Sequence, residues 1–381
     1  MRSTMTPSRW LFFTGAITAA LASIFAAEPH GVRTFVVCAI SLILLKHWRP
    51  GMRGVFLAIA LAALFAARVQ LSPVLVPAPP AIGWVTNVRA GFLEKLIAAM
   101  PEREARLGAG MLLGDVAEPA KDLVQQFRRA GINHLLAVSG GNLAVVLTFI
   151  SVLGASRWSR TTNALVVLIV APGFCLLTNV EPSILRASVM AILAVGVQRL
   201  GRPAQAMNIL VAAATLLIWV WPGLLWQSVG FQLSLAATFG LVAFSGPMEK
   251  ILSKHLPTSI ATVLAATLGA TLATLPPSLV TFGQVSIIGP LVNVLVVPLV
   301  PLVMACIGLV AVVSVILPPV APFAGSSAWA VLWAIERVVA LASSLPAASV
   351  LLPTAISFGL AGTITLTSLW RARKHVQPHF D

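Results

Sequence analysis

Charged side chains are scarce in this sequence. Asp, Glu, Lys and Arg together make up 9% of its 381 residues, whereas hydrophobic residues make up 58%. Ordinary soluble domains contain about 25% charged and roughly 45–50% apolar residues. A chain of this length with so few charges lacks the polar surface that would keep it in water. The composition therefore excludes a soluble enzyme and indicates an integral membrane protein.

The sequence also lacks the patterns that mark metal and catalytic sites. Its three cysteines lie in apolar runs without metal-ligand spacing, so neither a disulfide framework nor a zinc site is predicted. There is no P-loop, which excludes an ATP-driven pump acting alone, and the six histidines form no HExxH or HxxEH motif. We therefore expect no cofactor, no metal and no catalytic residue, and we predict that the protein is not an enzyme.

Long apolar runs predict an all-α, polytopic transmembrane helical bundle of about 10–12 spans. The predicted spans lie near residues 10–27, 32–45, 54–67, 134–153, 162–178, 183–198, 205–221, 229–245, 258–280, 286–316, 326–346 and 350–370. The run 286–316 is too long for one straight span and contains Pro290, Pro298 and Pro301. Because proline removes a backbone donor and breaks the helical hydrogen-bond ladder, we expect a broken or re-entrant helix there.

The basic residues predict how the chain is oriented. There are 25 Lys and Arg against 11 Asp and Glu, which gives a net charge of +14. Counted from a cytoplasmic N-terminus, nearly all basic residues of the short loops fall on one side, including Arg157, Arg160, Arg199 and Arg202, whereas Arg33 falls on the other. Positive charge near span ends is retained in the cytoplasm. We therefore expect a multi-pass protein of the inner, cytoplasmic membrane with both termini in the cytoplasm.

One long polar interval, residues 69–133, interrupts the apolar runs. It contains six of the eleven acidic residues, which fit a solvated face better than a catalytic pair. Within it, Phe92, Leu96 and Met100 recur at four-residue spacing. This spacing is typical of an amphipathic helix, and we expect interfacial amphipathic helices that lie on the membrane surface here.

Polar residues inside an apolar run are the first candidates for a functional site. His134, Ser139, Gly140, Gly141 and Asn142 are set into an otherwise apolar predicted helix. A pair of glycines weakens a helix, lets another backbone approach and frees polar groups at membrane depth. Small residues also pack helices tightly, and a serine can hydrogen-bond to its own backbone. The sequence leaves both interpretations open.

Further polar candidates lie in the later spans. Arg186 lies just inside an apolar run, and Glu181 lies at the outer end of the same span. Because a buried cation is costly unless it is paired or hydrated, Arg186 is a candidate with Glu181 as its expected partner. The alternative is an arginine that extends to the outer interface. The amides of Gln232, Gln284 and Asn293 either line a polar path or join helices to one another.

Four segments with these polar residues follow one another along the chain. They are residues 110–115 (GMLLGD) with 127–140 (FRRAGINHLLAVSG), 182–187 (PSILRA), 230–234 (GFQLS), and 282–286 (FGQVS) running on to Asn293 and Pro298. In this order they resemble the ComEC family, the polytopic competence proteins thought to pass transforming single-stranded DNA across the inner membrane. Asn142 stands where many members have a histidine, and asparagine cannot take up a proton near neutral pH.

The resemblance implies a membrane channel or permease that translocates single-stranded DNA into the cytoplasm during natural transformation. It also implies partners: a DNA receptor, a cytoplasmic ATP-driven motor and a separate nuclease, with membrane lipid around the chain. Many members carry an OB-fold domain and a metallo-β-lactamase-like domain. We expect neither here, because residues 69–133 show no alternating strand pattern and the sequence stops at Asp381.

The sequence thus predicts four parts and one set of path residues. The parts are N-terminal transmembrane helices (1–68), the polar loop with interfacial helices (69–133), a competence-like channel domain (134–370) and a basic cytoplasmic tail (371–381). The candidates for the DNA path are His134, Ser139, Gly140, Gly141, Asn142, Glu181, Arg186, Gln232, Gln284 and Asn293. A secondary transporter of a small solute also has broken helices and polar residues at the midplane. In a non-transporting membrane scaffold, these residues would only join helices.

Overall fold

The computed structural model describes residues 82–114, 120–154, 158–346 and 348–351. The three predicted N-terminal spans, the predicted tail and almost all of the predicted span 350–370 lie outside these residues. The chain divides by contacts into a larger unit, which includes residues 79–192 and 229–381, and a smaller unit, which includes 193–228. The two units are described separately.

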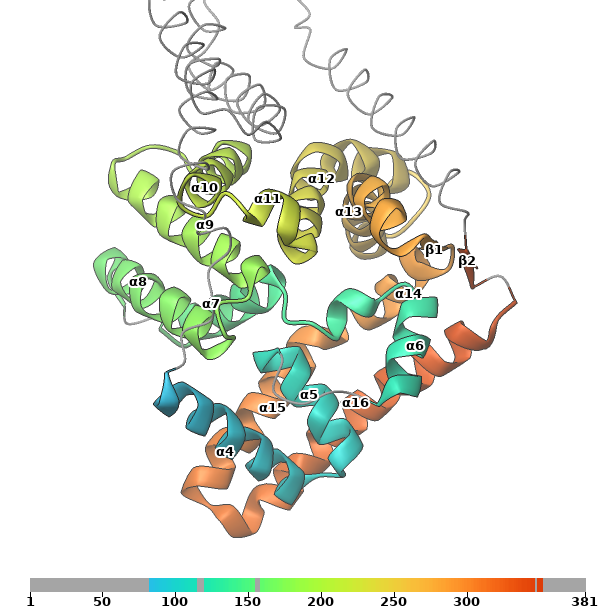
Figure 1. Cartoon of the computed structure of the whole chain (residues 1–381). Helices are drawn as coiled ribbons and strands as arrows, with labels where there is room; N and C mark the ends of the chain where they lie inside the picture. Colours follow the sequence, from blue (N-terminus) through green and yellow to red (C-terminus); the bar gives the residue numbers. More distant parts are fainter. Residues whose placement is uncertain (1–81, 115–119, 155–157, 347, 352–381) are drawn as a thin grey trace, which may run out of the picture. The chain divides into compact units, whose positions relative to one another are not determined.

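The larger unit consists almost entirely of helices (Figure 1). Its first half contains α4 (Gly83–Ala99), α5 (Glu102–Leu113), α6 (Lys121–Arg129), the 3-10 turn η1 (Asn133–Leu135), α7 (Gly140–Gly154), α8 (Arg160–Leu177) and most of α9 (Pro182–Arg199). Its second half contains α12 (Val229–Leu252), α13 (Thr258–Phe282), β1 (Gln284–Ser286), α14 (Gly289–Val296), α15 (Leu299–Ile316), η2 (Pro318–Val320), α16 (Ala321–Ser344) and β2 (Ser349–Leu351). The smaller unit contains the end of α9, α10 (Ala206–Val220) and α11 (Leu224–Gln227).

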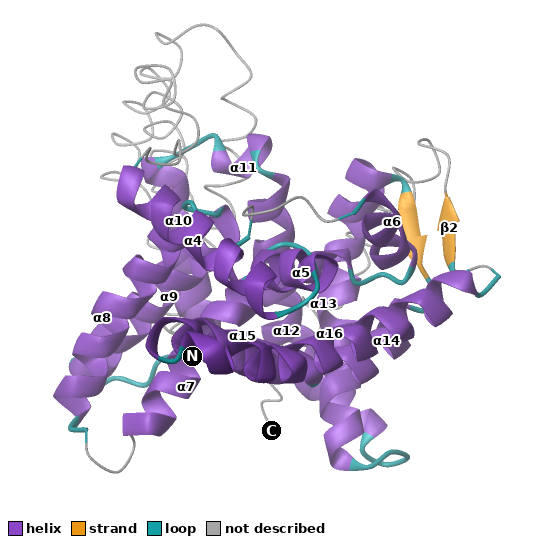
Figure 2. Ribbon diagram, turned by 90° about the horizontal axis from the view of Figure 1, so that it is seen from below, coloured by secondary structure: helices purple, strands orange, loops and turns teal. Residues whose placement is uncertain are grey.

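Five helical segments of the described chain are long and apolar enough to cross a membrane. They are Arg160–Leu177, Val229–Leu252, Thr258–Phe282, Leu299–Ile316 and Pro318–Ser344. The prediction of an all-α polytopic bundle is confirmed. The small exception is the antiparallel pair β1–β2, in which Val285 is paired with Val350 (Figure 2).

The main hydrophobic core lies where α4, α5 and α6 pack against α15 and α16 (Figure 1). Phe127 of α6, Ile307 of α15 and Leu332 of α16 are completely buried in it. The apolar stripe of α4 faces the same core, since Leu96 is completely buried and Met100 nearly so. The structure therefore covers this stripe with protein, whereas the sequence predicted contact with the membrane surface.

The run 286–316 is broken, as its prolines predict. It forms α14 and α15, which are separated by Val297 and Pro298. Pro298 has no backbone N–H to continue the ladder of α14, so a new helix begins after it. Pro290 and Pro301 lie in the first turns of α14 and α15, where a missing N–H leaves no helical bond unmade.

The joint before α14 is held by one serine hydroxyl. Ser286 Oγ lies 2.9 Å from the Arg129 carbonyl oxygen and 3.1 Å from that of Ala348, and it accepts a hydrogen bond from the Gly289 N–H (3.1 Å). Gly131 adopts φ +77°, and a Cβ there would lie 2.6 Å from the Cβ of Ser286. Only glycine fits this turn, which brings the end of α6 beside β1 (Figure 2).

Helices α12 and α13 form a hairpin whose backbones touch. A Cβ on Gly240 of α12 would collide with the carbonyl oxygen of Gly269 of α13. Such close approach needs residues without side chains, and it is typical of helix pairs in membranes.

Candidate functional site

A tight turn between α8 and α9 positions the first polar residues. Asn179 (φ 59°) and Val180 (φ 54°) are both left-handed, a conformation that is strained for a β-branched residue. The turn ends at Pro182, which occupies the first position of α9, where its fixed φ suits a helix. It places Ser183 and Arg186 about one turn apart on the same side of α9.

The predicted span 134–153 begins near His134, whereas helix α7 begins at Gly140. His134 lies in η1, and the chain bends before Gly140. The Gly140 N–H, one of the first amides of α7, donates to Ser183 Oγ (3.2 Å). A Cβ on Gly140 would lie 3.1 Å from the Cβ of Ala187 and 3.2 Å from Arg186 Nη2, so this glycine lets α9 approach the start of α7.

Arg186 is buried, with 5% of its surface exposed. Its Nε and Nη2 atoms donate to Ser234 Oγ of α12 (3.0 and 2.8 Å), and its Nη1 atom donates to the sulfur of Met190 (2.9 Å). The hydroxyls of Ser183 and Ser234 are 2.8 Å apart. Three helices, α7, α9 and α12, therefore meet at this guanidinium.

Asn142 joins the same group from the first turn of α7. Its Oδ1 atom accepts a hydrogen bond from Ser139 Oγ (2.9 Å), and its Nδ2 atom donates to the Met111 carbonyl oxygen of α5. The Ser139 hydroxyl thus bonds to a side chain and not to its own backbone. We call the residues Ser139, Gly140, Asn142, Ser183, Arg186 and Ser234 the polar cluster.

The polar cluster carries a positive charge that no carboxylate of the described residues pairs with. Among the described residues, Arg186 donates to Ser234 and Met190, both neutral, and the expected pairing with Glu181 is not formed. The N-terminus of α7, which has a partial positive charge, lies beside the same guanidinium. The site is therefore electrostatically suited to an anion.

Other predicted path residues are not members of the polar cluster. His134 is exposed on η1, and Gly141 follows Gly140 at the start of α7. Gln284 of β1 donates to Ser349 Oγ (2.7 Å). Asn293 of α14 is 6% exposed, and its Oδ1 atom is buried without a hydrogen-bond partner in the part of the chain that the structure describes. The structure does not bring Gln284 and Asn293 into the polar cluster.

Sequence reasoning did not select Ser183 and Ser234. Both serines occur in segments that carry the family resemblance, residues 182–187 and 230–234. Their place in these segments is the one feature of the sequence that could have identified them. Otherwise a serine in an apolar helix usually bonds to its own backbone.

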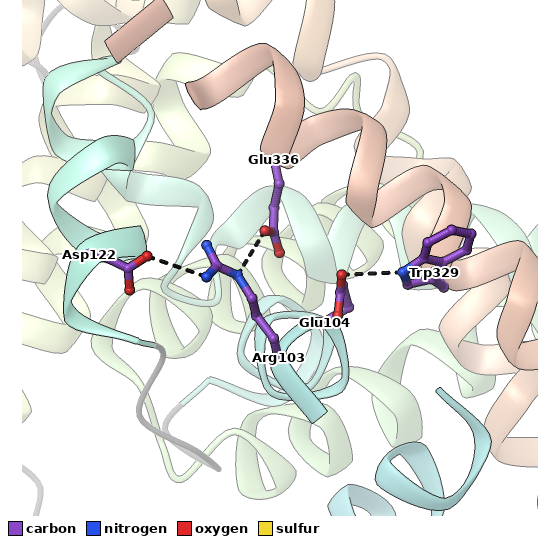
Figure 3. Close-up of polar contacts among 5 residues, drawn as sticks. All are labelled: Arg103, Glu104, Asp122, Trp329 and Glu336. Atoms are coloured by element: carbon purple, nitrogen blue, oxygen red, sulfur yellow. Dashed lines mark hydrogen bonds and ion pairs between the residues drawn. The ribbon is translucent and has the colours of Figure 1, made fainter. Parts of the chain in front are cut away.

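A second group of charges joins α5, α6 and α16 (Figure 3). Arg103 Nε donates to Glu336 Oε2 (3.0 Å), and Arg103 Nη1 donates to Asp122 Oδ2 (3.3 Å). Nearby, Trp329 Nε1 donates to Glu104 Oε1 (3.2 Å). Burial lowers the pKa of Arg103, but the two carboxylates raise it by more, so its pKa lies above the ordinary value. Acidic residues expected on a solvated face thus take part in contacts between helices.

The Arg103–Glu336 pair should stabilise the fold modestly. A double-mutant cycle with Arg103→Ala and Glu336→Gln is expected to give a coupling of about 1 kcal/mol, limited by solvent because the Arg103 side chain is 45% exposed. The pair Arg106–Glu102 on α5, with side chains 39% and 60% exposed, is the control and should give about 0.3–0.5 kcal/mol. Thermal unfolding of the purified protein measures both. Equal couplings would contradict a role for Glu336 in joining the helices.

The fold and the polar cluster together define a multi-pass helical membrane protein with a buried cationic site. Residues 111–374 match the family described as competence protein, and the chain belongs to this family. The chain is also similar to the ComE operon protein 3 of Bacillus subtilis (strain 168), with 29% identity over 223 residues. This similarity covers 56% of the chain and 27% of the relative's length. No solved structure matches. The resemblance to the ComEC family is confirmed.

Proposed function

We propose that this protein is a channel or permease that translocates single-stranded DNA into the cytoplasm during natural transformation. The observation that carries the proposal is the buried guanidinium of Arg186, whose acceptors Ser234 and Met190 are neutral. Membership of the competence protein family supports the same conclusion. All ten predicted path residues lie within the matched range 111–374.

The polar cluster suits the phosphodiester backbone of DNA. A buried cation in an apolar bundle is costly, and the adjoining N-terminus of α7 repels it further. An anion bound here would offset both the cost of burying the guanidinium and its repulsion by the N-terminus of α7. Arginine binds phosphate through two parallel N–H donors, and helix N-termini bind phosphate through backbone amides. Contact with phosphate alone also suits a path that must accept any base sequence.

The cluster is closed in this structure. Asn142 and Arg186 are each 5% exposed, and the polar groups bond to one another. Passage of a strand therefore requires α7, α9 and α12 to separate here, with phosphates and water replacing the internal hydrogen bonds. Each neutral bond of the cluster contributes about 0.5–1.5 kcal/mol and each bond from Arg186 about 1.5–3 kcal/mol, and bonds to the phosphates of a strand would replace them.

The wider assembly belongs to the same proposal. The chain spans 27% of the length of the relative it matches. A DNA receptor, an ATP-driven motor and a nuclease are proposed as its partners. We place the protein in the inner membrane with both termini in the cytoplasm, as the basic loops favour. The polar residues act in passage and not in a chemical reaction.

Electrical recording from planar bilayers tests the proposal. The purified chain is expected to conduct ions once the cluster opens, and single-stranded DNA added to one side should block the current. A secondary transporter would instead show solute uptake driven by a proton or sodium gradient. A scaffold would show neither activity. Either of these two outcomes would contradict the proposal that the protein is a channel.

A further inference from the structure

An apolar cavity that shares no lining residue with the polar cluster lies between α4, α5, α7, α8 and α15, which can be followed in Figure 1. Its volume is about 320 Å³. Residues from three of these helices that line it are Val88 and Phe92 of α4, Phe174 and Leu177 of α8, and Met304 and Gly308 of α15. Such a volume falls at the lower end of ligand sites in proteins, which are roughly 300–1,000 Å³.

The lining determines what the cavity accepts. The side chains around it are aliphatic, aromatic or thioether groups, and a cavity without polar partners does not hold water. Two of its walls, α8 and α15, are membrane-length helices. Acyl chains of lipids are the apolar molecules that surround such helices. We propose that this cavity binds one acyl chain of a phospholipid.

A cation adjoins the cavity and suits the lipid headgroup. Arg89 of α4 donates from Nη1 to the carbonyl oxygen of Leu177 (3.1 Å), and Leu177 itself lines the cavity. Arg89 is 8% exposed, so its charge acts in surroundings of low dielectric constant. The guanidinium would attract the phosphate that every phospholipid headgroup carries, while the acyl chain occupies the apolar space.

Gly308 provides a direct way to fill the cavity. A Cβ on Gly308 would meet no atom within 4 Å, so a larger side chain can enter the space without colliding with the protein near its Cβ. The Gly308→Phe variant is expected to fold and to exclude part of the acyl chain. Each methylene group excluded lowers binding about fourfold, so losing two or more lowers it at least about tenfold.

The test is lipid retention by the full chain, measured by native mass spectrometry. The protein is reconstituted in nanodiscs of phosphatidylglycerol and phosphatidylethanolamine and then transferred to detergent. The wild type should retain one phospholipid molecule, and Gly308→Phe should reduce its occupancy about tenfold or more. Gly173→Phe is the matched control, since Gly173 lies in α8, is not among the residues lining the cavity, and also has no atom within 4 Å of a Cβ.

The outcomes separate clearly. Retention of the lipid by wild type and Gly173→Phe, but not by Gly308→Phe, supports the site. Equal retention by all three proteins overturns it, because the lipid then binds elsewhere. Absence of a retained phospholipid from the wild type, or a peptide in its place, also overturns it. If Gly308→Phe does not fold, Gly308→Leu provides the same comparison with a smaller side chain.

Discussion

Replacing Arg186 by methionine is expected to reduce transformation to the level of a strain that lacks the gene. The change removes the buried charge at the meeting point of α7, α9 and α12 and leaves an apolar side chain of similar length. Removing a buried charge that donates only to neutral groups also removes the cost of burying that charge. The variant should therefore accumulate normally in the membrane. Transformation frequency, delivery of labelled DNA to the cytoplasm and the amount of protein are the measurements.

Two further variants make this test specific. Arg337→Met removes an arginine from α16, where its guanidinium lies 5.1 Å from the Trp333 ring, and it should leave transformation unchanged. Arg186→Lys keeps the charge but loses the pair of N–H donors that converge on Ser234 Oγ, so partial activity is expected. Normal transformation by Arg186→Met would show that the buried charge has no role in DNA passage.

Replacing Gly240 by alanine is expected to destabilise the protein strongly. The new Cβ would collide with the Gly269 carbonyl oxygen, which is backbone and cannot rotate away. The hairpin of α12 and α13 must then separate. Overpacking of this kind costs about 1–3 kcal/mol and occasionally more. Thermal unfolding and the monodisperse fraction in size-exclusion chromatography measure the effect.

The control for this variant lies on the same helix. Gly246 of α12 has no atom within 4 Å of a Cβ. Gly246→Ala should destabilise the protein less than Gly240→Ala, because its new Cβ is crowded only by the following Pro247 and not by the backbone of α13. If Gly240→Ala unfolds at the same temperature as Gly246→Ala, the backbones of α12 and α13 are not in contact as described.

Much of the fold follows from hydrophobicity and proline alone. The spans predicted near 162–178 and 258–280 agree with α8 and α13, and the break before α15 falls at Pro298. What covers the apolar stripe of α4 could not be predicted, because an apolar face packs equally well against lipid and against apolar helices. Leu96 is completely buried in protein for this reason, although its spacing also suits a membrane surface.

The candidate site was predictable in part. Ser139, Gly140, Asn142 and Arg186 were recognisable as polar or flexible residues in apolar runs, and the structure brings them together. Their partners were not recognisable, because contacts between helices depend on how the helices pack. Glu181 is near Arg186 in sequence but precedes α9, whereas Ser234 is 48 residues away and supplies the acceptor.

The serine hydroxyl at the joint before α14 has a mechanical consequence. Ser286 connects the last turn of α6, the first amide of α14 and the residue before β2 through a single oxygen atom. If α14 is displaced, either α6 moves with it or the hydrogen bonds of Ser286 break, at a cost of about 0.5–1.5 kcal/mol each. A displacement of α14 would in this way be transmitted to α6, whose other end holds Asp122 against Arg103.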